Sequence, residues 1–280
     1  MRRRPRVALA LAATALLAGA GLLGWAVLVE PGRLVVRETE VRSTRWPRPA
    51  LRIAVLTDLH VGSFRNGLGQ LDDVVARTNA ARPDLVVILG DLVIHDVLLG
   101  RFVPPEATAA RLAGLRAPYG VVAVLGNHDW WLDGPRVRSD LERAGIRVLE
   151  NEAAPFDEGA RRFWVAGLAD LWTRPVSIPH ALAGVPAEEP VLLLTHNPDV
   201  FPDVPPRVAL TLAGHTHGGQ VALPILGRPV VPSRYGQRYA NGLVVEGGRA
   251  LFVSPGLGTS LLPVRFRVPP EISVVTLAAP

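Results

Sequence analysis

The sequence predicts a layered α/β fold that follows an apolar N-terminal helix. Two observations support the α/β class, and a third concerns the number of domains. Short apolar runs recur along the chain, and continuous runs of β-branched and Leu residues are typical of strands buried on both faces. Helical stretches lie between these runs, as expected for layered sheets. The chain has 280 residues, of which 49% are hydrophobic, so it can bury one large core without division into several domains.

The predicted strands are short and end in polar residues. A first strand with alternating character spans residues 34–41. Helices are expected over residues 68–81 and 136–144. The six buried runs are LRIAVLTDLH (51–60), DLVVILGD (84–91), YGVVAVLGNHD (119–129), RFWVAGLAD (162–170), PVLLLTH (190–196) and VALTLAGHTH (208–217).

An uncharged run from Val7 to Val29 follows a group of Arg residues at the N-terminus. A helix of this length would extend for about 34 Å, which is enough to cross a hydrocarbon core of about 30 Å. One alternative is a cleaved signal peptide, with a cleavage site near residues 18–20, although the apolar region of such peptides is only about 7–15 residues long. The other alternative is a buried helix of a soluble protein. The Arg group predicts a cytoplasmic N-terminus, with the rest of the chain on the extracytoplasmic side of the cell membrane.

Most of the excess positive charge lies in this N-terminal segment. The net charge is +5, and removing residues 1–30, with four Arg and one acid, leaves +2. A nearly neutral remainder argues against a nucleic-acid partner, because binding a phosphate backbone usually requires a concentrated basic face. The chain contains no cysteine, which excludes disulfides and Cys-ligated metal sites.

Five of the predicted strands end in Asp, Asn or His. In α/β sheets, functional groups collect beyond the carboxyl ends of strands, so these side chains are expected to converge. Taken alone, each motif is more often a turn or a helix cap. Because five of the seven His residues lie in these motifs, the whole set indicates a metal site. The motifs are Asp58-Leu59-His60, Gly90-Asp91, Gly126-Asn127-His128-Asp129, Thr195-His196 and Gly214-His215-Thr216-His217.

In this order the motifs resemble the five blocks of the calcineurin-like metallophosphoesterases. Three further segments, LTHNPDVF (194–201), AGHTHGGQV (213–221) and GLGTSLLPVRFRVPPEI (256–272), are similar to the bacterial membrane-associated branch of that superfamily. The resemblance covers nearly the whole chain. It implies a four-layer α/β/β/α sandwich over residues 51–280, preceded by an anchor or signal segment (1–29) and by a linker with the first strand (30–50). It also implies metal-dependent hydrolysis of a phosphate ester.

The resemblance further implies a centre of two divalent metal ions. Carboxylate and imidazole ligands suit Mn, Fe or Zn, and the sequence leaves the identity of the metal open. A water that bridges two ions loses a proton near neutral pH and can attack the phosphorus. The implied ligands are Asp58, His60 and His217 for one ion and Asn127, His196 and His215 for the second, with Asp91 bridging the two.

Two further roles follow from the resemblance, and a third is suggested by the residue types. His128 is the implied general acid, which protonates the leaving oxygen. Asp129 would orient His128 or, alternatively, close the turn. Arg234 and Tyr235 lie in the segment after the last motif and are candidate substrate contacts, since Arg suits phosphate; a solvated loop is the alternative reading.

The expected substrate is a phosphodiester of a lipid or of a nucleotide-sugar lipid. This expectation rests on the N-terminal helix and on the apolar segment 257–268. A general phosphomonoesterase or nucleotide phosphodiesterase is the alternative enzyme. A second alternative is a protein that is not an enzyme and uses the same fold as a binding scaffold. Such a protein should have lost metal ligands or His128, and here all seven implied ligands and His128 are present. The sequence leaves the oligomeric state open.

Overall fold

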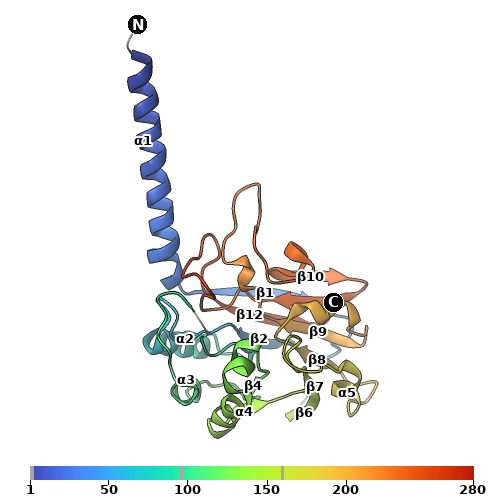
Figure 1. Ribbon diagram of the computed structural model, residues 1–280. Coiled ribbons are helices and arrows are strands. Elements are labelled where there is room, and N and C mark those ends of the chain that lie inside the picture. Colours follow the sequence, from blue (N-terminus) through green and yellow to red (C-terminus); the bar gives the residue numbers. More distant parts are fainter. Residues whose placement is uncertain (1–2, 95–96, 159–160) are drawn as a thin grey trace.

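The computed structural model describes residues 3–94, 97–158 and 161–280 of the chain. Two six-stranded sheets form its centre (Figure 1). In spatial order, the first sheet consists of β1 (Val35–Arg42), β12 (Glu271–Ala278), β2 (Leu51–Leu56), β3 (Leu85–Ile88), β4 (Val121–Ala123) and β5 (Arg147–Val148). The second consists of β10 (Gly242–Glu246), β11 (Arg249–Val253), β9 (Val208–Ala213), β8 (Val191–Leu194), β7 (Arg161–Gly167) and β6 (Glu152–Glu158).

Most neighbouring strands in both sheets run parallel. Strands β2, β3, β4 and β5 are parallel in the first sheet, as are β7, β8, β9 and β11 in the second. Parallel strands end at the same edge of a sheet, so the polar residues that follow them are brought together. The strands predicted from the six apolar runs are all present, and the predicted first strand is β1.

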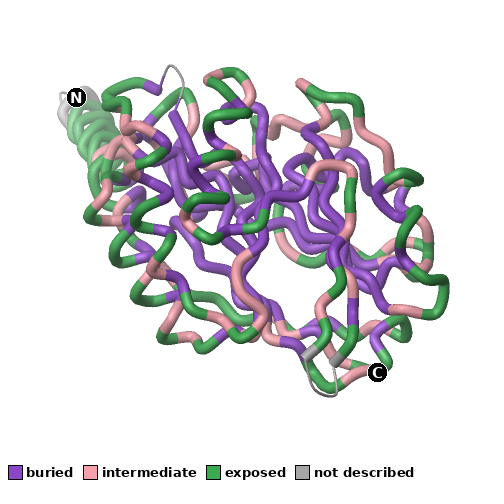
Figure 2. The backbone as a smooth tube through the Cα atoms, turned by 90° about the horizontal axis from the view of Figure 1, so that it is seen from below, coloured by how far each residue is buried: buried purple, intermediate pink, exposed green. Residues whose placement is uncertain are grey.

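Helices cover the sheets, and three apolar clusters hold the layers together. One cluster joins the first sheet to α2 (Leu68–Ala80), α3 (Pro105–Leu112) and α4 (Asn127–Arg143). A second contains residues of both sheets, such as Ile53 and Leu210. The third joins the second sheet to α5 (Ile178–Leu182) and η3 (Pro198–Asp203). Figure 2 shows the buried residues concentrated in the interior of the molecule, with exposed residues around its periphery. The α/β class predicted from the sequence is therefore confirmed.

Helix α4 begins at Asn127, well before the expected start at residue 136. The Asp129 carboxylate accepts a hydrogen bond from the Gly126 N–H at 3.0 Å, which caps the first turn of the helix. Pro135 is accommodated because the backbone leaves helical geometry at Asp133. The predicted stretch of residues 136–144 therefore corresponds to the second half of this helix.

The N-terminal apolar helix is present as α1 (Arg3–Gly24), followed by η1 (Trp25–Val29) and η2 (Glu30–Gly32). Residues 8–32 are long and apolar enough to cross a membrane, and only 6% of the apolar window is buried. The same criteria also fit a signal sequence. Figure 1 shows α1 projecting away from the sheets. The η1 and η2 segments that follow α1 are part of the fold, because Ala26 of η1 and Glu30 and Pro31 of η2 are buried.

Candidate metal centre

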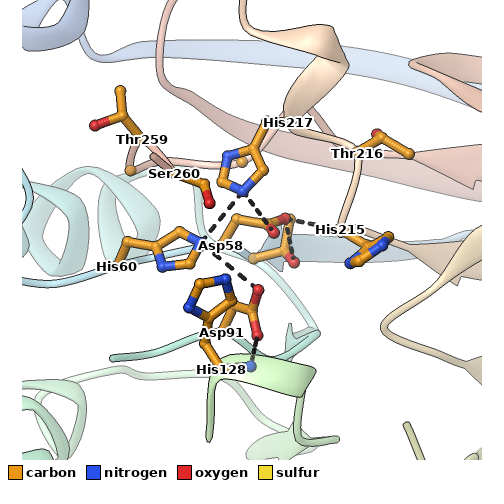
Figure 3. Close-up of polar contacts among 12 residues, drawn as sticks. Asp58, His60, Asp91, His128, His215, Thr216, His217, Thr259 and Ser260 are labelled. Carbon is orange, nitrogen blue, oxygen red and sulfur yellow. Dashed lines mark hydrogen bonds and ion pairs between the residues drawn. The ribbon is translucent and has the colours of Figure 1, made fainter. Parts of the chain in front are cut away.

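The seven implied ligands converge at the carboxyl ends of five strands. Four follow β2, β3 and β4 of the first sheet, and three follow β8 and β9 of the second. Figure 3 shows the side chains of Asp58, His60, Asp91 and His217 close together, directed toward a common centre. The seven implied ligands are all buried, with exposed fractions of 5% or less, and comprise Asp58, His60, Asp91, Asn127, His196, His215 and His217.

These residues form two groups of donor atoms. In the first, Nε2 of His217 lies 3.3 Å from Oδ1 of Asp58 and 3.2 Å from Nε2 of His60. In the second, Nε2 of His196 lies 3.2 Å from Oδ1 of Asn127 and 3.1 Å from Nδ1 of His215.

Asp91 lies between the two groups. Its Oδ2 atom is 3.2 Å from Nε2 of His196 and 3.6 Å from Nε2 of His60. Donor atoms of Asp91, His196 and His215 lie within 4.8 Å of one another, as do those of Asp58, His60 and His217. This is the placement that a bridging carboxylate requires.

Hydrogen bonds to backbone carbonyls fix the tautomers of two histidines. Nδ1 of His60 lies 2.9 Å from the carbonyl oxygen of Val93, and Nδ1 of His196 lies 2.6 Å from that of Leu89. A carbonyl only accepts, so in the neutral imidazole Nδ1 carries the hydrogen and Nε2 directs its lone pair into the cluster.

Acceptor atoms therefore face one another in the cluster. Oδ1 of Asp58 is buried and accepts no hydrogen bond from the described residues. The lone pair on Nε2 of His196 faces oxygens of both Asp91 and Asn127. Such convergence is repulsive unless a positive charge lies between the atoms. The donor set, four imidazoles, two carboxylates and an amide, fits divalent cations of intermediate hardness.

The electrostatics of the cluster also favour bound cations. Burial lowers the pKa of His60 and of His215 to about 3, which keeps them in the neutral form that binds metals. Burial also lowers the pKa of His196, but the charge and hydrogen bond of Asp91 outweigh it and raise that pKa to about 10. The carboxylates thus attract positive charge to the centre of the cluster.

Five of the seven residues have a left-handed backbone, with φ of 49° for Asp58, 39° for His60, 55° for Asp91, 70° for His215 and 52° for His217. A non-glycine residue in this region costs on the order of 1–3 kcal/mol, and such residues cluster at functional sites. Neighbouring loops enforce the strain. The N–H of Gly258 donates to the carbonyl of Asp58 at 2.7 Å, and a Cβ on Gly256 would lie 2.7 Å from the Cβ of Asp58.

His128 and Asp129 lie in the first turn of α4 and contact Asp91 in different ways. The backbone N–H of His128 donates to Oδ1 of Asp91 at 2.9 Å, and its ring makes an edge contact with that of His60, with centroids 4.6 Å apart. The Asp129 carboxylate accepts backbone N–H groups of Asp91 and Leu92, both at 2.9 Å, as well as that of Gly126. These contacts fit the turn-closing alternative for Asp129.

A cavity of about 320 Å³ opens onto the cluster. The sequence interpretation did not single out Trp172, Gln220 or Ser260, which line it together with ligand residues. Trp172 packs edge-on against His215, with ring centroids 4.3 Å apart. The one available signal was its position just after the strand-end residue Asp170. The other described residues of the lining are Asp91, Asn127, His128, Trp131, His215, Thr216, His217, Gly219, Val230, Pro232 and Leu261.

The structure does not bring Arg234 and Tyr235 to this cavity. The backbone N–H of Arg234 donates to Oδ2 of Asp199 at 2.9 Å, and its guanidinium lies 3.7 Å from the same carboxylate. Tyr235 packs against the apolar cluster that joins the second sheet to α5 and η3. Arg234 lines a separate, larger cavity of about 530 Å³, which includes none of the predicted ligands.

Comparison with known proteins agrees with the geometry. A family model for calcineurin-like phosphoesterase matches residues 51–219, and the chain belongs to this family. The protein is a metal-dependent phosphoester hydrolase.

Three relatives cover nearly all of the chain. It is 33% identical to the uncharacterized metallophosphoesterase YkuE of Bacillus subtilis (strain 168), over 96% of this chain and 93% of that protein. It is 32% identical to the phosphodiesterase YaeI of Escherichia coli (strain K12), over 95% and 96% respectively. It is also 32% identical to a transmembrane protein with metallophosphoesterase domain of Danio rerio, over 96% of this chain and 62% of that protein.

Proposed function

We propose that the protein hydrolyses a lipid phosphodiester at a centre of two divalent metal ions. The observation that carries the reaction is the position of Asp91, whose Oδ2 atom lies within 3.6 Å of an imidazole nitrogen of each ligand group. The name of the Escherichia coli relative, a phosphodiesterase, supports a diester over a monoester.

The residues of the chain have distinct roles in this proposal. Ions bound there would supply a deprotonated water and neutralise the phosphoryl oxygens. Asp58, His60 and His217 would hold one ion, Asn127, His196 and His215 would hold the second, and Asp91 would contact both. His128, whose ring lines the cavity, donates a proton to the leaving oxygen. Asp129 fixes the two turns that carry Asp91 and His128.

The lipid substrate is supported by the apolar side of the cavity. Trp131, Trp172, Val230 and Leu261 line it together with the polar ligand set, which suits a phosphate attached to an apolar group. The N-terminal helix supports membrane attachment, as does the transmembrane relative of Danio rerio. In this proposal residues 1–29 anchor the chain, and residues 51–280 act on the extracytoplasmic side, as the Arg group before the helix favours.

The test uses the full chain in detergent micelles, loaded separately with Mn²⁺, Fe²⁺ or Zn²⁺. We expect hydrolysis of a phosphodiester lipid with at least one metal, and loss of hydrolysis in Asp91→Asn. Equal rates for the wild type and this variant would contradict the proposed centre. A soluble diester, a phosphomonoester and a nucleotide diester serve as comparison substrates; a clear preference for any of them over the lipid would favour the alternative enzyme.

A further inference from the structure

The end of the N-terminal helix is hydrogen-bonded to the loop that passes the metal centre. The carbonyl of Ala26 accepts the backbone N–H of Arg265 at 2.9 Å. The carboxylate of Glu30 accepts the N–H of Val268 at 2.8 Å and the indole N–H of Trp25 at 2.9 Å. The guanidinium of Arg265 is wholly buried and donates to the carbonyl of Gly258. The end of the apolar segment is therefore attached to the loop beside the cavity.

The same loop is joined to two others. The N–H of Phe266 donates to the carbonyl of Gln220 at 2.8 Å, and the N–H of Ala222 donates back to Phe266 at 2.9 Å. The N–H of Leu98 donates to the carbonyl of Leu261 at 3.0 Å. Three loops, containing residues 97–100, 220–232 and 256–268, thus form one hydrogen-bonded unit at the lower end of the helix.

Exposed aliphatic side chains gather on these three loops. Single exposed aliphatic residues are ordinary, whereas a contiguous group on joined loops indicates a binding surface. Segments 221–227 and 256–264 contain no charged residue, and exposed Arg267 lies beyond the second. We name this group the apolar rim; it consists of Leu98, Leu99, Ile225, Leu226, Val230, Leu261 and Leu262, each more than half exposed.

The apolar rim faces the side from which α1 projects. Figure 1 shows the loop of residues 222–232 rising on the same side of the sheets as the helix. Trp25, which is 41% exposed, lies four residues before the end of the apolar run at Val29, in the region where tryptophan favours a membrane interface. Val230 and Leu261 belong both to the rim and to the lining of the metal-centre cavity.

We propose that the apolar rim enters the interfacial layer of the bilayer that α1 crosses, so that the cavity opens onto the lipid surface. The occupant is a bilayer because the helix that is joined to the rim is long and apolar enough to cross one. A phosphate group at the depth of the lipid headgroups would then meet the metal ligands, with its apolar part along Val230 and Leu261. This inference extends the proposed membrane attachment and the proposed lipid substrate.

The position of the rim can be measured without activity. The chain has no cysteine, so Leu226→Cys introduces a single site for an environment-sensitive fluorophore in the full chain, reconstituted in nanodiscs. Asp157→Cys on β6 is the matched control, because Asp157 is exposed and Figure 1 places β6 at the end of the molecule opposite α1. We expect spin-labelled lipids to quench the label at residue 226 and not at residue 157. Equal quenching by aqueous iodide at both sites would overturn the proposal.

The consequence for catalysis has its own test. In liposomes, the double variant Ile225→Ser, Leu226→Ser is expected to hydrolyse a lipid phosphodiester about tenfold more slowly, since interfacial binding scales with buried apolar area. Its rate on soluble bis(p-nitrophenyl) phosphate should not change. Val245→Ser, which replaces an exposed aliphatic residue on β10, is the control. An unchanged lipid rate in the double variant would contradict the proposal. If the wild type cleaves neither diester, the proposed function fails, while the fluorophore still reports where the rim lies.

Discussion

Glu30 and Val268 are joined by a buried hydrogen bond of 2.8 Å between a carboxylate oxygen and a backbone N–H. They lie near opposite ends of the sequence, and the bond joins the end of the apolar helix to the loop beside the metal centre. Glu30 is only 3% exposed, although an acid at the end of a membrane span would ordinarily face water. The region expected to be a linker is thus part of the fold.

We expect Glu30→Ala to destabilise the full chain by about 1–3 kcal/mol, because it leaves the Val268 N–H and the Trp25 indole without their acceptor. Thermal unfolding in detergent measures the change. Glu40→Ala, at a half-exposed carboxylate paired with surface Arg42, is the control and should unfold like the wild type. Equal melting temperatures for both variants would show that the helix end is not held by this contact.

His128→Gln is expected to lower kcat by about 10²–10⁴, the usual contribution of a general acid. The loss should be greatest for substrates with poor leaving groups and small for p-nitrophenyl esters, whose leaving oxygen needs no proton. Metal content should stay at the wild-type level. His180→Gln, at an exposed histidine outside the cavity, is the matched control. The same loss for good and poor leaving groups would exclude proton donation by His128.

Asp129→Asn separates the two roles considered for this residue. An amide places an N–H₂ group against one or more of three backbone N–H donors, so we expect destabilisation of about 2–4 kcal/mol. If Asp129 only closes the turn, kcat of the folded variant at low temperature should fall far less than in His128→Gln. A stable variant with a loss of kcat equal to that of His128→Gln would instead assign Asp129 to orienting the acid.

Gly256→Ala is expected to weaken metal binding through Asp58. The new Cβ would lie 2.7 Å from that of Asp58, in a backbone with φ of 70°. Gly145→Ala provides the control, because its φ of 81° is similar and a Cβ there meets no atom within 4 Å. Both variants pay the conformational cost of a left-handed alanine, about 1–2 kcal/mol. Only Gly256→Ala should raise the metal concentration needed for half-maximal activity; an equal increase in both would refute the contact as the cause.

Removal of metal should destabilise the folded protein, because the buried carboxylates and imidazoles lose the cations that hold them together, and a proton on His196 replaces only part of that charge. Each ion present at a hundredfold excess over its Kd contributes about 2.7 kcal/mol. Calorimetry with and without a chelator tests this, and readdition of metal should restore the melting temperature. A chelated protein that melts at the same temperature as the untreated protein would contradict a bound centre.

The buried strands and the convergence of the polar residues that follow them could be predicted from the sequence, because local patterns encode both. Uninterrupted apolar runs predicted the buried strands, and the order of the polar residues that follow them predicted which side chains converge. Arg234, a candidate substrate contact, lies outside the metal-centre cavity because it pairs with Asp199, 35 positions away, and nothing local indicates that pairing. The burial of Glu30 and Arg265 could not be predicted either. The carboxylate of Glu30 accepts a hydrogen bond from the distant Val268 N–H, and the guanidinium of Arg265 donates to backbone carbonyls of an irregular loop, such as that of Pro255.

The fixed helix end has a consequence for how the protein searches for its substrate. A catalytic domain on a flexible tether tumbles about three axes, and only a fraction of encounters present the pocket to the membrane. In the proposed membrane-bound state, a domain bonded to its own helix through Ala26 and Glu30 would keep one tilt and one height and rotate only about the membrane normal. Its encounters with a membrane-bound ester would then be collisions in a plane, each at a productive angle.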